Sequence, residues 1–255
     1  KFTIPPALSA IHQKLQPRLG GPHILTGPVA VRGAKAGQVL EVRIKSIELN
    51  YDWGYNAIRP LAGALPDDFK EPRCIHIPLD KQRMTGTLPW GLELPLKPFF
   101  GIMAVAPPVA WGAVNSPPPR RNGGNMDNKE LVAGSILYIP VFVPGALFQV
   151  GDGHAAQGDG EVDQTAIETS LRGRLQLIVR TDMTLTWPRA ETATDFITMA
   201  TDPDLVTATK TAIQDMVDFL VATRGLSRHE AYQLTSIAGN VAITQLVDLP
   251  NLGVH

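Results

Sequence analysis

Val39–Leu49 has the sequence VLEVRIKSIEL and carries the clearest strand pattern of the chain. Within it, Leu40, Val42 and Ile44 alternate with the side chains at positions 39, 41 and 43. Successive side chains of a strand point to opposite faces, so this period of two is typical of a half-buried strand. The sequence therefore predicts a β-sheet built around this segment.

Two other stretches extend this prediction. Leu171–Arg180 (LRGRLQLIVR) repeats the alternating pattern, and Ser135–Val143 (SILYIPVFV) is a continuous apolar run, typical of a strand covered on both faces. Pro144 and Gly145 follow the apolar run and favour a tight turn. We therefore expect a hairpin in which residues 146–150 return beside the apolar run.

After residue 190 the sequence changes to helical signals. Asp202–Asp204, with a central proline, predicts the start of a helix that runs to about Arg224, with Thr201 or Asp202 as its cap. Ser227–Glu230 has the capping-box pattern, so a second helix is expected there. Val241–Asp248 (VAITQLVD) then predicts a strand.

Together these elements predict an α+β fold that is mainly β. We expect a sandwich-like or barrel-like β body over residues 1–190, and a smaller C-terminal part of two helices and a strand over residues 191–255. A length of 255 residues suits one large domain or two closely packed ones.

Composition narrows the class of partner. The formal net charge is −1, which provides no basic field to attract nucleic acid. No apolar run approaches the roughly 20 residues that a membrane span needs, so we expect no membrane partner. The single cysteine, Cys74, rules out an intramolecular disulfide and fits a reducing compartment, and we expect a cytoplasmic protein.

Two segments concentrate polar groups and glycines: residues 121–129 (RNGGNMDNK) and residues 150–162 (VGDGHAAQGDGEV). Asp152 and His154 are two residues apart, so on a strand they would share a face and could bind one cation. Alternatively, Glu161 or Asp152 could be a general base with His154 as its partner. If the hairpin forms, the two segments meet at one rim.

Other side chains could complete such a site. Asn125 and Gln157 carry amides that both donate and accept hydrogen bonds, which suits recognition of another amide. His23 could be a further metal ligand, and Glu168 follows Glu161 by seven residues. The glycines, Gly153 among them, let the backbone approach a ligand closely.

Several plainer interpretations stay open. Asp-Gly pairs commonly form turns, and a glycine-rich acidic loop can bind calcium only to hold itself together. The chain would then be a non-catalytic, β-rich binding module. Cys74 could instead be a nucleophile with His76 beside it, although a packed small residue is also consistent with the sequence.

At these residues the chain resembles the acetamidase/formamidase family. The resemblance covers roughly residues 22–250 and is carried by the segments LTGPVAV (25–31), AGQVLEV (36–42), PFFGIMAVAP (98–107), GGNMD (123–127), GDGHAAQGDGE (151–161) and TAIE (165–168). Tyr51–Gly91 departs from the family pattern. Because that region is expected to contribute walls of the pocket, the departure leaves the exact substrate open.

The resemblance implies a hydrolase that cleaves short amides, linear or cyclic, to a carboxylate and ammonia or an amine, on a β-rich and often oligomeric protein. It also implies a divalent metal, zinc in preference to calcium, and no organic cofactor. We therefore expect a homo-oligomer in which a water attacks the carboxamide carbon. The expected residues are, for the metal, Asp127, Asp152, His154 and His23; for catalysis, Glu161, His154 and Asp152; and for the substrate, Asn125, Gln157, Gly153 and Glu168.

Overall fold

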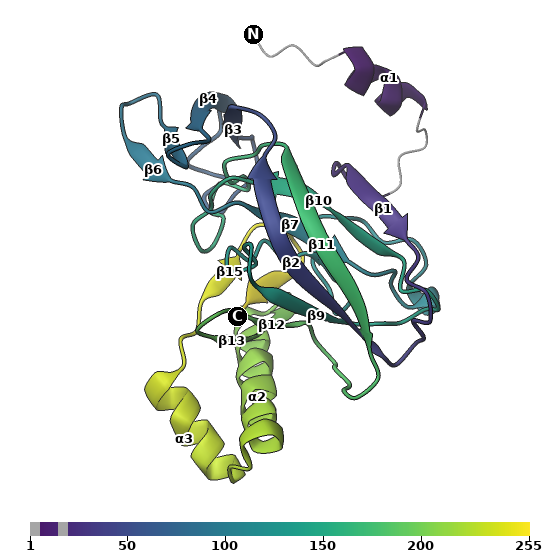
Figure 1. Cartoon of the computed structure of the whole chain (residues 1–255). Helices are drawn as coiled ribbons and strands as arrows, with labels where there is room; N and C mark the ends of the chain where they lie inside the picture. The colour runs from purple at the N-terminus through teal and green to yellow at the C-terminus, as the bar shows by residue number, and fades with distance from the viewer. Residues whose placement is uncertain (1–5, 15–19) are drawn as a thin grey trace.

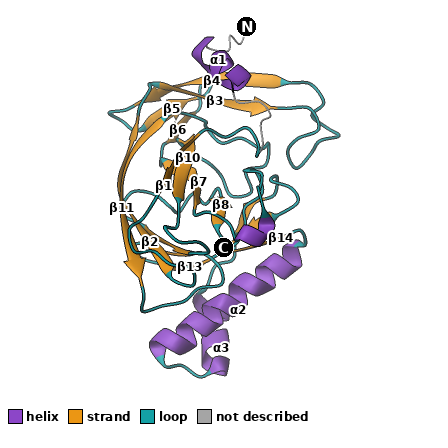
Figure 2. Cartoon of the chain, turned by 90° about the vertical axis from the view of Figure 1, so that its right-hand side faces the viewer, coloured by secondary structure: helices purple, strands orange, loops and turns teal. Residues whose placement is uncertain are grey.

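The computed structural model describes residues 6–14 and 20–255. Antiparallel strands form most of the regular secondary structure, with two helices near the C-terminus (Figures 1 and 2). The predicted mainly β, α+β class is therefore confirmed. A short helix α1 (Pro6–Lys14) precedes the first strand, and a 3-10 turn η1 (Val109–Trp111) interrupts a proline-rich loop.

Strand β2 (Val39–Leu49) has the bounds that the alternation predicts, and it runs through a five-stranded sheet. The order of this sheet is β11 (Leu171–Arg180), β2, β9 (Ile136–Pro140), β12 (Arg189–Glu191) and β13 (Phe196–Thr198). The long neighbours β2 and β11 cross the middle of Figure 1. The first four residues of β2 are all buried, so that end of the strand is covered on both faces, and its exposed residues, Lys45 and Glu48, lie in the second half.

A second, four-stranded sheet packs against the first. Its order is β1 (Leu25–Val29), β10 (Phe148–His154), β7 (Phe99–Ala104) and β8 (Gly123–Asn125). Leu40 and Val42 of β2 share one core with Met103 of β7 and Phe148 of β10. The two sheets therefore bury their facing sides against each other, as in a β-sandwich.

The expected hairpin is wrong. Strand β9 pairs with β2 and β12, whereas β10 pairs with β1 and β7, so the two lie in different sheets. Between them the chain crosses from one sheet to the other, through Gly145, Ala146 and Leu147, all with positive φ. A tight-turn sequence can join two strands of one sheet as a hairpin, or it can lead the chain from one sheet to the next. The apolar patterns of β9 and β10 are consistent with both arrangements.

A third sheet forms one end of the molecule. Its order is β3 (Trp53–Ile58), β4 (Arg73–Asp80), β5 (Thr85–Thr87) and β6 (Glu93–Pro95). Ile77 and Leu79 of β4 pack with Leu88 and Leu96 in a core of their own. Backbone bonds between Tyr55 of β3 and Glu168 join this sheet to the region that precedes β11.

The C-terminal region holds α2 (Leu205–Arg224) and α3 (Arg228–Ala238), followed by β15 and β16. Asp204 caps α2, not the predicted Thr201 or Asp202, because its carboxylate accepts the Thr207 N–H. The capping box of Ser227 and Glu230 is confirmed in both of its hydrogen bonds. The helices project from the β body (Figures 1 and 2).

The predicted strand at 241–248 is shorter and pairs with one strand, β16. It spans β15 (Ile243–Gln245), in a three-stranded sheet of order β14 (Ala200–Asp202), β16 (Leu252–Val254), β15. The division at residue 190 stays a prediction. Within residues 6–14 and 20–255, no helix is long and apolar enough to cross a membrane.

Candidate active site

Strand β10 carries the first pair of candidate residues. Asp152 and His154 lie on one face of it, as their spacing predicts, with Nε2 of His154 3.4 Å from Oδ2 of Asp152. The His154 side chain is fully buried, and the edge of its ring meets Phe99 at a centroid distance of 5.1 Å. Packing thus fixes the imidazole in place before any ligand binds.

The other polar segment, residues 121–129, reaches the same place through strand β7. Strand β7 pairs with β10 on one side and with β8 on the other, so the residues after β8 arrive beside β10. Oδ1 of Asp127 lies 3.9 Å from Nδ1 of His154. The predicted meeting of the two polar segments is therefore confirmed, although a shared neighbouring strand brings them together and not a hairpin.

Gln157 orients the imidazole. Its Oε1 is 2.9 Å from Nδ1 of His154, and its Nε2 donates to the backbone oxygen of Asp127 at 2.7 Å. A carbonyl oxygen can only accept, so this contact places the hydrogen of the neutral ring on Nδ1. The other nitrogen, Nε2, then faces Asp152 and Glu168.

Two glutamates complete the surroundings of His154. Oε1 of Glu168 is 3.4 Å from Nε2 of His154 and also accepts the Ala166 N–H. Glu161 is buried, at 7% exposure. Glu161, Asp127 and Asp152 all have positive φ values, between 45° and 60°, although none is glycine. Such backbone strain persists where the surrounding structure imposes it, and it gathers at functional sites.

Asp248 belongs to the cluster and was missed from the sequence. Its Oδ2 accepts a hydrogen bond from Nδ2 of Asn125 at 2.8 Å, and Oε1 of Gln245 accepts the backbone N–H groups of Val247 and Asp248. The C-terminal sheet thus delivers one carboxylate to the site. Asn125 keeps a buried Oδ1 that no donor among the described residues reaches.

Gly101 of β7 was also missed. A Cβ at this position would lie 2.4 Å from Oδ1 of Asp127 and 2.6 Å from Oδ2 of Asp152. The absence of a side chain therefore gives both carboxylates their room. The signal in the sequence is a glycine inside an apolar strand, which often marks a place where another group approaches the backbone closely.

Replacing Gly101 with Ala is expected to lower turnover at least about tenfold, because the carboxylates must move from their positions. The φ of Gly101 lies outside the left-handed region, so the backbone tolerates alanine. Gly158→Ala is the matched control, since its Cβ would enter open space. Circular dichroism should match the parent for both variants. Equal activity of the two variants would contradict this role of Gly101.

The site holds more acids than bases. Burial and the carboxylates of Asp248 and Glu168 raise the pKa of Glu161 to about 8, against the opposing effect of His154. Burial, foremost, also raises the pKa of Asp127 well above its usual range and that of Asp248 to about 6. A cation would relieve this crowding of negative groups.

The pKa values of His154 and Asp152 shift in the direction opposite to the one that burial favours. Burial acts to lower the pKa of His154, but the carboxylates of Glu168 and Asp152 raise it well above its usual value. For Asp152, burial acts to raise the pKa, and His154 with His23 outweighs it and holds the pKa low. Each of the two pKa shifts thus arises from the charge of neighbouring side chains, against the effect of burial.

The described part of the chain offers two groups of three side chains that could hold a metal ion, and His154 belongs to both. One group joins Asp127, His154 and Glu161, and the other joins Asp152, His154 and Glu168. The ligand atoms of each group lie within 4.8 Å of one another. Both carboxylate oxygens of Asp127 are buried with no donor among the described residues, which suits a metal ligand.

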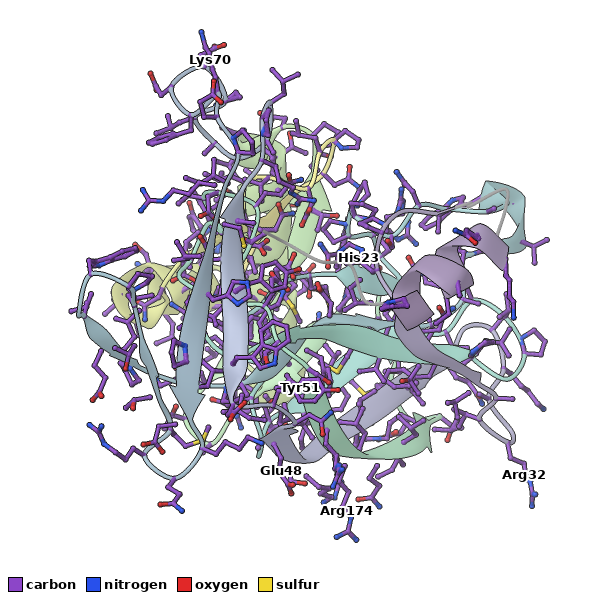
Figure 3. The ribbon with its side chains drawn as sticks, turned by 90° about the horizontal axis from the view of Figure 1, so that it is seen from above. His23, Arg32, Glu48, Tyr51, Lys70 and Arg174 are labelled. Atoms are coloured by element: carbon purple, nitrogen blue, oxygen red, sulfur yellow. The ribbon has the colours of Figure 1, made fainter. Side chains whose placement is uncertain are left out.

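The predicted ligand His23 lies at the edge of this cluster. Its Nε2 is 3.9 Å from Oδ2 of Asp152, and its Nδ1 contacts the Ser116 hydroxyl at 2.6 Å. In the view from above, His23 and Tyr51 lie toward the middle of the molecule, while Arg32 and Lys70 extend from its edges (Figure 3). His23 therefore lines the cavity that leads to this cluster, and it belongs to neither of the two groups around His154.

A cavity of about 950 Å³ opens onto the cluster. Asp152, His154, Glu161 and Glu168 line it, together with Gly153. The predicted substrate-binding residues Asn125, Gly153 and Glu168 therefore reach this space, whereas both ends of the Gln157 amide contact the protein. The cluster is thus a buried set of acids and one imidazole that a small molecule can approach.

The sequence profile of the acetamidase/formamidase family matches residues 11–116 and 108–255. The chain belongs to this family. The two polar segments that converge on His154 are among those that carry the family resemblance in the sequence.

Known members of the acetamidase/formamidase family agree with this assignment. The chain is 29% identical to the acetamidase of Mycolicibacterium smegmatis, over 55% of this chain and 49% of that protein. It is also 29% identical to the formamidase of Methylophilus methylotrophus, over 55% of this chain and 47% of that one. The chain thus spans about half the length of these sequence relatives.

A solved structure supports the fold as well. The crystal structure of the acetamidase from Bacillus halodurans superposes with a TM-score of 0.84 at 34% identity, covering 90% of this chain and 76% of that chain. The sandwich and the C-terminal helices therefore belong to a known acetamidase/formamidase architecture.

Within this family member, Cys74 lies on β4, where Ala57 of β3 is its partner. Burial raises the pKa of its thiol, which disfavours the thiolate that a nucleophile needs. Among the described residues that line the cavity around His154, Ala57 is present and Cys74 is absent. The geometry favours the packed interpretation of Cys74.

Proposed function

We propose that this chain hydrolyses the C–N bond of small carboxamides such as formamide and acetamide, with a carboxylate and ammonia as products. The observation that supports this proposal is the convergence of the two family segments on one buried cluster at the floor of a cavity. Reaction chemistry needs converging acids and bases that face a space of suitable size.

The donor set suits a divalent cation. Asp127, His154 and Glu161 would hold it, and zinc fits this mixture of imidazole and carboxylate better than calcium, which prefers six to eight oxygens. When bound, such an ion polarises a carbonyl oxygen and makes a water molecule more acidic. The second group, Asp152, His154 and Glu168, is the alternative position.

The side chains divide the remaining tasks. A carboxylate, Glu161 or Glu168, takes a proton from the attacking water and passes it to the leaving nitrogen. Whichever of the two is free of the cation is the base. The Asn125 amide, held by Asp248, and the backbone at Gly153 bind the carboxamide, and a donor of this kind contributes about 3 kcal/mol in the transition state.

An ammonia-release assay tests the proposal. Ammonia release from formamide and acetamide, and amino acid formation from a γ-lactam, would be measured with the purified chain, before and after chelation, and after zinc or calcium is returned. We expect ammonia from the linear amides, loss of activity on chelation and recovery with zinc. Zinc binding without any hydrolysis would instead support the non-catalytic binding module.

We also propose a homo-oligomer, as the family resemblance implies, and a cytoplasmic location, which the single cysteine favours. Light scattering of the purified protein would give its mass in solution. A mass equal to one 27.5 kDa chain at micromolar concentration would contradict the oligomer.

A further inference from the structure

One face of β3 and its flanking residues forms a wall of the active-site cavity. Every second residue from 51 to 59 lines it: Tyr51, Trp53, Tyr55, Ala57 and Arg59. A strand presents alternate side chains on one face, so this is a continuous surface. Three neighbouring aromatic side chains at one end of the wall make it apolar and flat there.

The rings are stacked. Tyr51 and Trp53 have ring centroids 6.1 Å apart with an angle of 18° between planes, and Trp53 stacks on His76 of β4 at 5.8 Å and 12°. His76 therefore supports Trp53 from the neighbouring strand. Yet Tyr51 is 51% and Trp53 43% exposed, so much aromatic surface still faces solvent.

This wall is fixed directly to the catalytic cluster. The backbone N–H and C=O groups of Tyr55 both bond with Glu168, at 2.9 and 2.8 Å. The Thr169 hydroxyl donates to the Trp53 backbone oxygen at 2.7 Å. A molecule whose carboxamide reaches His154 and Glu168 can therefore place its other end against Tyr51 and Trp53.

The volume of the cavity also favours a substrate larger than acetamide. Acetamide has four non-hydrogen atoms, and four water molecules occupy about 120 Å³ in the liquid. The cavity of about 950 Å³ is several times larger, and it falls in the range typical of sites for larger organic ligands. A formyl or acetyl group alone would leave the aromatic wall uncovered.

We infer that the preferred substrates are primary amides whose acyl group carries a planar aromatic ring, which packs against the exposed surface of Trp53 and Tyr51. The inference rests on the proposed amide hydrolysis and specifies its substrate class. The reaction is R–CONH2 + H2O → R–COO− + NH4+, in which the C–N bond breaks, a C–O bond forms and the nitrogen receives the protons. Tyr51–Gly91, the segment that departs from the family pattern, supplies the aromatic wall.

The test compares kcat/KM for phenylacetamide with that for acetamide, by ammonia release. We expect phenylacetamide to exceed acetamide at least about tenfold. Trp53→Ala should reduce this ratio about five- to tenfold, and Trp53→Phe should restore much of it because a ring remains. Trp111→Ala is the control, since Trp111 has a similar 40% exposure but packs on Phe142.

The outcomes separate the two proposals. Acetamide hydrolysis without faster turnover of phenylacetamide would overturn the aromatic preference and leave amide hydrolysis standing. The same holds if Trp53→Ala lowers both rates equally while its circular dichroism is unchanged. Release of ammonia from neither amide would overturn amide hydrolysis and the aromatic preference together.

Discussion

Replacing Glu161 with Gln is expected to lower kcat/KM for acetamide by about 10²–10⁴-fold, the usual contribution of a general acid–base group. Glutamine keeps the shape of the side chain but cannot take a proton. Burial and the carboxylates of Asp248 and Glu168 raise the pKa of Glu161 to about 8, so the neutral glutamine replaces a group whose uncharged form the fold already favours. The variant should therefore fold at least as stably as the parent.

The zinc content of the Glu161→Gln variant assigns the role of this residue. If Glu161 is the base, the variant keeps its zinc and loses turnover. If it is a ligand with Asp127 and His154, zinc and turnover fall together, and Glu168 is left as the base. Glu48→Gln, an exposed glutamate at the edge of the molecule (Figure 3), should change neither. Near-normal turnover in Glu161→Gln would exclude both roles.

Local patterns predicted the elements better than their partners. The bounds of β2 and β11 agree with the segments that the sequence predicts as strands, because a strand pattern is set by neighbouring residues. The partner of β9 was mispredicted, because an apolar run satisfies either of two packed sheets equally well. Pairing depends on distant residues, whereas alternation depends on neighbours.

The same division holds within the site. Asp152 and His154 could be placed together because two residues of one strand decide their geometry. Asp248 could not, because it meets Asn125 across 123 residues through the fold of the C-terminal sheet. Gly101 leaves room for two carboxylates because it has no side chain. This role cannot be predicted from the sequence, because it depends on the positions of Asp127 and Asp152 in the fold.

Asp127→Asn is expected to act in opposite directions on stability and on function. The carboxylate of Asp127 is 1% exposed, and no donor among the described residues reaches its oxygens. A buried polar group in that position costs about 1–3 kcal/mol. In the chelator-treated protein, asparagine should therefore raise the free energy of unfolding by about this amount, and its amide can donate to Asp248.

The pH dependence follows from the raised pKa of Asp127, which burial causes. An acid whose pKa is higher in the folded state than its unfolded value of about 3.9 lowers stability as the pH rises above that value. The gain in Asp127→Asn should therefore be present at neutral pH and vanish below about pH 4. Urea unfolding of the metal-free protein at both pH values measures it, with the exposed Asp68→Asn as control.

Zinc affinity and acetamide turnover should fall in the same variant, although its stability rises. With its anionic ligand gone, the Asp127→Asn variant is expected to bind zinc at least about tenfold more weakly and to lose acetamide turnover by about 10²-fold or more. A group that only supported the fold would lower stability when replaced and leave zinc affinity intact. A stabilised variant that has lost its zinc would show that Asp127 is kept for its charge, at a cost to the fold that the bound cation offsets.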